Sequence, residues 1–506
     1  MPRLVAFFLF SLCGSFPALA VLHPAKIFSD HMVLQRDTEV PVWGQSDAGA
    51  TVTVAFAGQS VKAKADKQGR WKLKLDAMKA STEGRSLDIS SGDQRMLIKD
   101  VLVGDVWFAG GQSNMDYKVK GMVPRLPKAK VLADGANYPA IRHRKVNERN
   151  AVVPQSDLNG GSWVVCTPKT VHGFSGVAFV FARRLHLELK VPIGVIDCAW
   201  GGTPIEPYVP AEAFTGHPTL VKLAKYAKAG DSEAIKKMDG GTCVRSPAWL
   251  AGAIYNGRIA PVAPYGIRGA IWYQAESNCG KGEDPRDYRF KQRALIEGWR
   301  KSFEKPHLPF YFVQLPQWKS YAWTYAREEQ LQAMQVKGTG MAVTIDLDNA
   351  NDIHPPNKID VGERLALWPL AKVYGKKIPF SGPLFRKAEF RATEAVVHFD
   401  YAKEGLMIGR IVGVGKIVED KDGTLNGFEL SGQDGVWHPA KAKVKGQAVL
   451  VKSLSVKKPV AVRYACHPEA PKAHPWNLYS KADLPASPFC SDWNLMPYDP
   501  AENPMH

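Results

Sequence analysis

The sequence predicts an α/β core with a parallel sheet, flanked on both sides by all-β, sandwich-like units. Two patterns lead to this fold class. Short apolar strands alternate with amphipathic helical stretches in the middle of the chain, and polar–apolar alternation without a helical period marks both ends. The 506 residues suit about two or three domains. We expect an N-terminal β domain at 21–98, an α/β domain at 99–378 and a C-terminal β domain at 379–506.

Residues 1–20 have the features of a signal peptide. Arg3 gives a positive start, the apolar run 4–12 is too short to span a bilayer, and Ala18 and Ala20 suit a cleavage site. We expect cleavage near Ala20 and a secreted or periplasmic protein, with an uncleaved membrane anchor as the alternative. No later stretch is long and apolar enough for a transmembrane helix, so no stable membrane insertion is expected.

The composition is that of a globular protein with a basic surface. The chain is 45% hydrophobic and 23% charged, and its formal net charge is +17. A basic surface attracts anionic partners such as acidic glycans, while a solvated surface with no specific partner is the alternative. The lysines are scattered and no nucleic-acid-binding motif occurs, so no nucleic-acid partner is expected.

The cysteines permit disulfides and give no sign of a metal site. Export allows disulfide formation, and Cys466 with Cys490 and Cys243 with Cys279 are plausible pairs by location, whereas buried free thiols are the alternative. No Cys-x-x-Cys or Cys/His spacing suggests a bound metal. The sequence does not set the oligomeric state.

The outer units and the core differ in their predicted elements. The ends carry alternating strands, at 51–56 and 71–75 in the N-terminal unit and at 395–399 and 460–464 in the C-terminal unit. In the core we expect helices at 178–189 and 288–303 and strands at 103–109, 192–197, 267–273, 310–313 and 341–345. Such alternation gives a parallel sheet covered on both faces, and ligands bind beyond the carboxyl ends of its strands.

The first core strand leads into a glycine pair and a serine, Gly110-Gly111-Gln112-Ser113. Glycines allow a sharp turn, and a following helix would place Ser113 at its N-terminus, where its own N–H faces a developing oxyanion. Met115 excludes the G-x-S-x-G motif. A serine that only caps a helix is the alternative.

Two further segments follow core strands. Gly201 and Gly202 come after strand 192–197, and their backbone N–H groups could contact a ligand. After strand 267–273, Gln274 could donate to an oxyanion, and Glu276 could bind sugar hydroxyls or orient a base. An ordinary turn and a surface loop are the respective alternatives.

The fourth segment carries the candidate base, His354, with Asp352 two residues before it. A serine hydroxyl is a poor nucleophile at its normal pKa, so it needs a base, and the base needs an orienting group. Asp352, Asp348 and Glu276 compete for that role. A nucleophile, oxyanion donors and a base predicted at one sheet edge indicate acyl transfer.

In this order, the four segments resemble the sialate O-acetylesterase family of SGNH/GDSL-type hydrolases. The likeness rests on GQSNM, on WYQ-x-ES and on DIHP, and it extends through four further stretches, at 31–36, 362–367, 476–479 and 484–489. The resemblance covers nearly the whole mature chain and implies an SGNH-like three-layer core.

The resemblance also implies roles for individual residues. Ser113 matches the nucleophile, His354 the base and Asp352 the triad acid. The matching oxyanion donors are Ser113, Gly202 or its neighbour Gly201, and Gln274. We expect Gly201, Glu276 and Asn278 to bind the substrate. The family usually has Gly where this chain has Ala275, which is strained if the backbone there needs a positive φ.

By resemblance, the expected activity is that of a serine esterase that removes acetyl groups from O-acetylated sialic acids. An acetyl esterase for xylan or another polysaccharide is the alternative with the same chemistry. A carbohydrate-binding protein on a hydrolase scaffold is the non-enzymatic alternative. The chemistry needs no metal or organic cofactor, and the expected partner is an acetylated carbohydrate.

Overall fold

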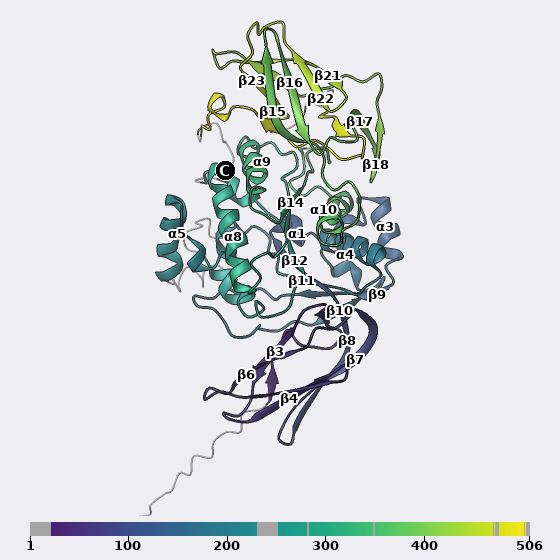
Figure 1. The fold of residues 1–506 in the computed structure, drawn as a ribbon, viewed down its shortest axis with the longest axis vertical. Helices are drawn as coiled ribbons and strands as arrows, with labels where there is room; N and C mark the ends of the chain where they lie inside the picture. Colours follow the sequence, from purple (N-terminus) through teal and green to yellow (C-terminus); the bar gives the residue numbers. More distant parts are fainter. Residues whose placement is uncertain are drawn as a thin grey trace, which may run out of the picture.

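The computed structural model describes residues 22–229, 251–280, 283–347, 350–468, 470, 475–499 and 501. Along its long axis, an N-terminal β unit lies at one end, a C-terminal β unit lies at the other, and a layer of helices and strands lies between them (Figure 1). This arrangement confirms the predicted α/β core with flanking all-β units.

The core is built on a sheet whose strands run in the order β10 (Trp163–Cys166), β9 (Tyr138–Lys145), β11 (Ile193–Asp197), β8 (Gln94–Gly111), β12 (Gly269–Tyr273), β13 (Phe310–Val313) and β14 (Thr339–Ala342). From β9 to β14 all neighbours are parallel, whereas β10 is an antiparallel edge strand. The carboxyl ends of the parallel strands therefore share one edge, as the sequence predicts.

Helices cover both faces of this sheet because successive strand side chains point to opposite sides. Trp107 packs edge-on against Phe181 of α4, and the next residue, Phe108, packs against Trp299 of α8. One layer contains α4 (Gly176–Leu189) and α10 (Lys358–Lys372), and α8 (Tyr288–Ser302) lies in the opposite layer (Figure 1). The other α-helices in the described part of the chain are α1 (Ser113–Asp116), α2 (Val119–Met122), α3 (Pro127–Asp134), α5 (Pro218–Ala229) and α9 (Ala322–Ala333).

The N-terminal unit is joined to the core through β8, whose first half pairs with β7 and whose second half belongs to the central sheet. The expected boundary between residues 98 and 99 falls inside this strand. The other strands of the unit are β1 (His23–Pro24), β2 (Val33–Gln35), β3 (Val40–Gln45), β4 (Thr51–Phe56), β5 (Gln59–Lys64), β6 (Arg70–Leu75) and β7 (Ser81–Ser91).

The C-terminal unit follows α10 and consists of antiparallel sheets. The strands expected at 395–399 and 460–464 correspond to β16 and β23. The strands are β15 (Leu384–Arg391), β16 (Glu394–Asp400), β17 (Leu406–Gly413), β18 (Lys416–Glu419), β19 (Phe428–Ser431), β20 (Trp437–Pro439), β21 (Lys441–Lys445), β22 (Ala448–Lys452), β23 (Ala461–Tyr464), β24 (Leu478–Ser480) and β25 (Phe489–Cys490).

The structure corrects one of the two expected disulfides. Cys466 and Cys490 are buried free thiols, and their sulfur atoms donate to the backbone oxygens of Phe489 and Asp492. Cys243 and residues 1–20 lie outside the described residues. Within the part of the chain that the structure describes, no helix has both the length and the apolar character needed to cross a membrane.

Candidate active site

Ser113 and His354 meet at the carboxyl edge of the central sheet. Ser113 is the first residue of α1, and only Gln112 separates it from the end of β8. His354 Nε2 lies 2.8 Å from Ser113 Oγ, although the two residues are 241 positions apart. This distance lets the imidazole accept the hydroxyl proton, so the two predicted residues have the geometry of a nucleophile and its base.

The turn that exposes Ser113 depends on Gly111. Its φ is +133°, and a Cβ at this position would lie 2.1 Å from the backbone oxygen of Tyr273. That same oxygen accepts a 3.0 Å bond from the Gln112 N–H. Any side chain at position 111 would therefore force β8 and β12 apart just before the nucleophile.

The loop after β11 passes directly beside the nucleophile. The Trp200 N–H donates to the Gly111 oxygen at 2.9 Å. A Cβ on Gly201 would lie 3.5 Å from Ser113 Cβ, and Gly202 follows with a φ of +72°. Gly201 thus leaves open space next to Ser113, and both glycines are exposed, as an acyl-binding site needs.

His354 is held through its backbone and by neighbouring side chains. Asp352 Oδ1 accepts a 2.8 Å bond from the His354 backbone N–H, and Asp352 Oδ2 pairs with Arg125 at 2.6 Å. The carboxylate predicted as the triad acid therefore fixes the loop that carries the imidazole. The Tyr117 ring lies against the imidazole, with ring centroids 6.4 Å apart. Asp348, a competing orienting group, lies outside the described residues.

The pKa of His354 is lowered from its ordinary value. Burial has the largest effect, and the Lys358 ammonium lowers the pKa further, while Asp352 opposes both. A base with a lowered pKa is neutral, and so able to accept a proton, at neutral pH.

Gln274 does not have the orientation expected of an oxyanion donor. Its side chain is fully buried, and its Nε2 lies 3.0 Å from Gln112 Oε1, 2.9 Å from Asn278 Oδ1 and 3.3 Å from the Thr203 oxygen. Both amide hydrogens therefore already have acceptors. Through these contacts Gln274 joins the segments that follow β8, β11 and β12.

The two residues expected to bind substrate after Gln274 are also turned into the protein. Glu276 is 7% exposed and its Oε1 accepts a 2.6 Å bond from Asn114. Asn278 is 1% exposed, and its Nδ2 donates to both carboxylate oxygens of Glu206. Asn278 therefore supports the loop and does not face a ligand, whereas Glu276 Oε2 is buried without a hydrogen-bond partner among the described residues.

Asn114 is the site residue that sequence reasoning missed. It is fully buried, and its Nδ2 donates to Glu276 Oε1 and, at 2.9 Å, to the backbone oxygen of Ile353. Its Oδ1 accepts from the buried Lys358 ammonium. One side chain thus ties the nucleophile helix to the residue just before the base. The sequence offers only its place next to Ser113 as a signal.

Comparisons with known proteins agree with this geometry. A family model described as carbohydrate esterase, sialic acid-specific acetylesterase, matches residues 103–368, more than half of the chain. The chain belongs to this family. Human sialate O-acetylesterase is 30% identical over 425 residues, which cover 75% of this chain and 76% of the human protein. The rat sialate O-acetylesterase is 29% identical over 433 residues, covering 75% and 79% of the two chains.

A solved structure supports the same assignment over almost the whole length. The crystal structure of a carbohydrate acetylesterase from Xanthomonas citri shares 34% identity and has a TM-score of 0.79, covering 93% of this chain and 99% of that one. The predicted family and fold are therefore confirmed, and the chain is an ester hydrolase of the carbohydrate esterase class.

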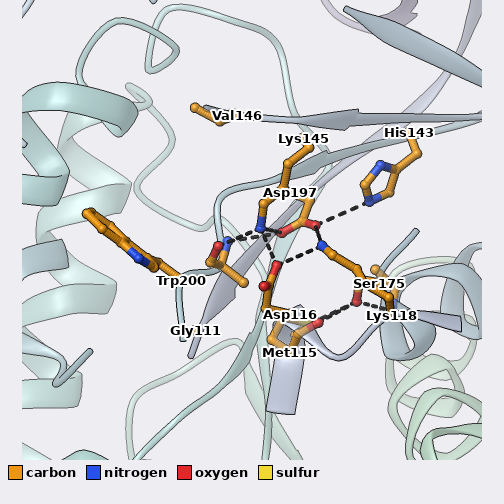
Figure 2. A network of polar contacts seen from close by, with 12 residues as sticks. Gly111, Met115, Asp116, Lys118, His143, Lys145, Val146, Ser175, Asp197 and Trp200 are labelled. Atoms are coloured by element: carbon orange, nitrogen blue, oxygen red, sulfur yellow. Dashed lines mark hydrogen bonds and ion pairs between the residues drawn. The ribbon is translucent and has the colours of Figure 1, made fainter. Parts of the chain in front are cut away.

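In this esterase, an ion network around the fully buried Asp197 fixes the nucleophile helix against the loop that carries Gly201 (Figure 2). Asp197, at the end of β11, accepts a 3.0 Å bond from the Ala199 N–H and lies 3.3 Å from the Lys145 ammonium. Lys145 and Lys118 both also pair with Asp116, the last residue of α1. Movement of α1 relative to this loop would break these pairs.

The Asp197 carboxylate at the centre of this network is stable as an ion. Burial acts to raise the pKa of Asp197, but the Lys145 and Lys118 ammonium groups, together with His143 Nε2 at 3.3 Å from Asp197 Oδ2, hold it well below its ordinary value. The carboxylate therefore stays ionised in the interior, where it can keep its pairs with Lys145 and Lys118.

We expect Asn114→Ala to impair catalysis more than binding. Removing the amide leaves Glu276 and Lys358 without their shared partner and releases the Ile353 oxygen. We expect kcat to fall roughly 100-fold and the free energy of unfolding to fall by about 2–3 kcal/mol. Kinetics on p-nitrophenyl acetate and urea unfolding measure both. Asn137→Ala, at an exposed asparagine, is the matched control, and unchanged kcat in Asn114→Ala would contradict the expected role.

Ala275 adopts a backbone conformation that the family usually gives to glycine. Its φ is +147° and its ψ is −11°, and it is fully buried. We expect Ala275→Gly to raise the free energy of unfolding by about 1 kcal/mol, because relief of roughly 1–3 kcal/mol of strain exceeds the entropic cost of glycine. Chemical denaturation measures the change, and a loss of stability would show that methyl packing outweighs strain.

Among the described residues, no group of three or more His, Cys, Asp or Glu side chains is arranged to hold a metal ion. The polar groups gathered around Ser113 are amides, paired ions and backbone N–H groups, which suit proton transfer and oxyanion stabilisation.

Proposed function

We propose that the protein is a secreted or periplasmic serine esterase that removes acetyl groups from O-acetylated carbohydrates, foremost O-acetylated sialic acids. The 2.8 Å contact between Ser113 Oγ and His354 Nε2 carries the proposal. The rat and human relatives are named sialate O-acetylesterases, and the Xanthomonas citri relative is a carbohydrate acetylesterase. The leader at 1–20 would direct export, with the three domains divided near residues 98 and 378.

In the proposed reaction, His354 takes the Ser113 proton as Oγ attacks the acetyl carbonyl carbon. The backbone N–H groups of Ser113 and Gly202 donate to the oxyanion of the tetrahedral intermediate. His354 then gives the proton to the sugar oxygen, which leaves as the alcohol and leaves acetyl-serine behind. A water molecule that His354 deprotonates attacks the acetyl group, and acetate departs as Ser113 recovers its proton.

The supporting residues have distinct roles in this mechanism. Gln274 and Asn114 hold the loops around Ser113 together by hydrogen bonds, and Asp352 with Arg125 holds the segment that carries His354. We expect these residues to affect kcat through the alignment of Ser113 and His354, since none of them contacts the reacting atoms.

We expect kcat/KM to rise with pH and to reach half its maximum below pH 6.5, the ordinary pKa of histidine. The base works only when neutral, and burial together with Lys358 lowers the pKa of His354, so the neutral form persists to lower pH. A pH profile with p-nitrophenyl acetate measures this midpoint. A midpoint above 6.5 would contradict the role of a buried imidazole beside a cation.

Acetate release across a panel of substrates tests the proposed function. The panel contains O-acetylated sialic acids, both free and joined to other sugars, acetylated xylan and other acetylated glycans, each incubated with the wild-type protein and with a heat-denatured sample. We expect release from acetylated sialic acid at the highest kcat/KM. Preference for xylan would replace the proposed substrate, and release from no acetylated sugar would refute the proposed function.

A further inference from the structure

A polar groove lies beyond the carboxyl ends of β9 and β11 and is lined in part by Trp200, the residue before Gly201. Its volume is about 810 Å³, and it is lined by Lys26, Glu148, Arg149, the segment 155–159 and Trp200. This volume lies within the ~300–1,000 Å³ of typical ligand clefts. Lys26 comes from the N-terminal β unit, so that unit forms one wall of the groove.

The order of strands connects the groove to Ser113. Ser113 follows β8, Trp200 follows the neighbouring β11, and Glu148 and Arg149 follow β9, the next strand along. Adjacent strands lie about 4.8 Å apart, so β9 runs roughly 10 Å from β8 in the sheet. Gly201 lies against Ser113 and directly follows Trp200 in the chain. A residue that lines the groove is therefore joined to the residue that contacts the nucleophile.

Trp200 supplies an aromatic surface within this groove. The buried Arg258 guanidinium lies over its ring, 5.5 Å from the ring centroid, while Trp200 itself stays partly exposed. Arg258 covers part of the ring and holds it in place, and the rest of the Trp200 side chain lines the groove. A held indole offers an apolar face on which the C–H side of a pyranose ring can pack.

Hydrogen bonds within the protein hold the other wall of the groove, around Arg149 and Asp157, in place. Arg149 donates to Gln155 Oε1 and to the backbone oxygen of Asp157. Asp157 Oδ1 in turn accepts from the Lys26 backbone N–H at 2.9 Å. The wall therefore needs little ordering when a ligand binds, which lowers the entropic cost of binding.

The charges of the groove favour a neutral ligand that is rich in hydroxyl groups. Lys26 and Arg149 are balanced by Glu148 and Asp157, and Ser156 and Asn159 add neutral polar groups. An anionic ligand would meet carboxylates as well as cations, whereas sugar hydroxyls can both donate to carboxylates and accept from ammonium or amide groups.

We propose that this groove binds the sugar units attached to the acetylated one, so that the preferred substrate is an oligosaccharide or polysaccharide and not a free monosaccharide. The inference rests on the proposed esterase function and adds to it a recognition site next to Trp200. The neighbouring units pack on the indole and hydrogen-bond to the polar wall while the acetyl group lies at Ser113.

Two variants test the groove. Trp200→Ala removes the aromatic surface, and Ser156→Trp fills the groove from an exposed position on its wall. Substrates are used in matched pairs that differ only in the attached sugars: O-acetylated sialyl-lactose with O-acetylated sialic acid, and O-acetylated xylotriose with an O-acetylated methyl xyloside. Leu454→Trp, at a residue 99% exposed on the C-terminal unit, is the control.

For at least one pair, we expect the wild-type protein and Leu454→Trp to hydrolyse the oligosaccharide with a kcat/KM about tenfold above that of the monosaccharide. In both groove variants this ratio should fall toward one. A wild-type ratio near one for both pairs, or an unchanged ratio in both variants, would overturn the inference and leave the esterase function intact.

A binding measurement separates failure of the inference from failure of the esterase function. Calorimetry with unacetylated sialyl-lactose and unacetylated xylotriose requires no hydrolysis. We expect at least one to bind the wild-type protein and to bind Ser156→Trp about tenfold more weakly. If no acetylated sugar is hydrolysed, binding of one probe that Ser156→Trp weakens still supports a sugar site in the groove. If neither probe binds, the groove proposal is refuted.

Discussion

Replacing Ser113 with alanine is expected to abolish ester hydrolysis, lowering kcat by about a millionfold. The substitution removes only the Oγ atom that lies 2.8 Å from His354 Nε2, and with it the atom that would carry the acetyl group. The oxyanion donors and the substrate groove stay in place, so a small rate above that of water should remain. Acetate release measured with p-nitrophenyl acetate gives the size of the loss.

The control for Ser113→Ala is its stability. Ser113 is only partly buried, and its backbone keeps the same hydrogen bonds, so thermal unfolding should occur within a degree or two of the wild-type midpoint, an effect of roughly 0.5 kcal/mol or less. An active Ser113→Ala variant would mean that another group attacks the ester, and the site at the end of β8 would lose its assigned role.

Replacing Gly111 with alanine is expected to cause the largest loss of stability. The new Cβ would lie 2.1 Å from the backbone oxygen of Tyr273, and a φ of +133° is unfavourable for any residue with a side chain. Backbone atoms at the centre of the sheet cannot move away as a flexible side chain can. We expect a loss of about 4 kcal/mol or more, seen as little soluble protein or a much lower unfolding midpoint.

Gly58→Ala separates the close contact from the effect of backbone conformation. Gly58 has a φ of +83°, but a Cβ added there, in the turn between β4 and β5, would have no atom within 4 Å. The Gly58→Ala variant should therefore lose only about 1 kcal/mol of stability. Equal effects of the two substitutions would show that the Tyr273 contact does not limit position 111.

The sequence predicted the sheet and the catalytic pair because their signals are local. Apolar runs such as 310–313 give strands, and a residue placed directly after a parallel strand must lie at the carboxyl edge. Ser113 comes two residues after β8, so strand order places it at this edge. His354 comes twelve residues after β14, so its position also depends on the loop that Asp352 and Asn114 hold. The strain expected at Ala275 was also confirmed, with a φ of +147°.

The sequence could not give the direction of each side chain. Gln274, Glu276 and Asn278 follow β12 at the correct edge, but their amide and carboxylate groups turn inward to partners far away in the chain. The role of Asn114 was missed for the same reason, because its three partners come from segments more than 160 residues away. Hydrogen-bond partners of this kind become visible only in the folded protein.

The meeting of Ser113 and His354 is tested most directly by labelling with a fluorophosphonate, followed by peptide mapping. We expect the wild-type protein to carry the label on Ser113, and His354→Ala to label far more slowly because the hydroxyl has lost its base. Label on a different residue, or an unchanged labelling rate in His354→Ala, would contradict a nucleophile and base paired across 2.8 Å.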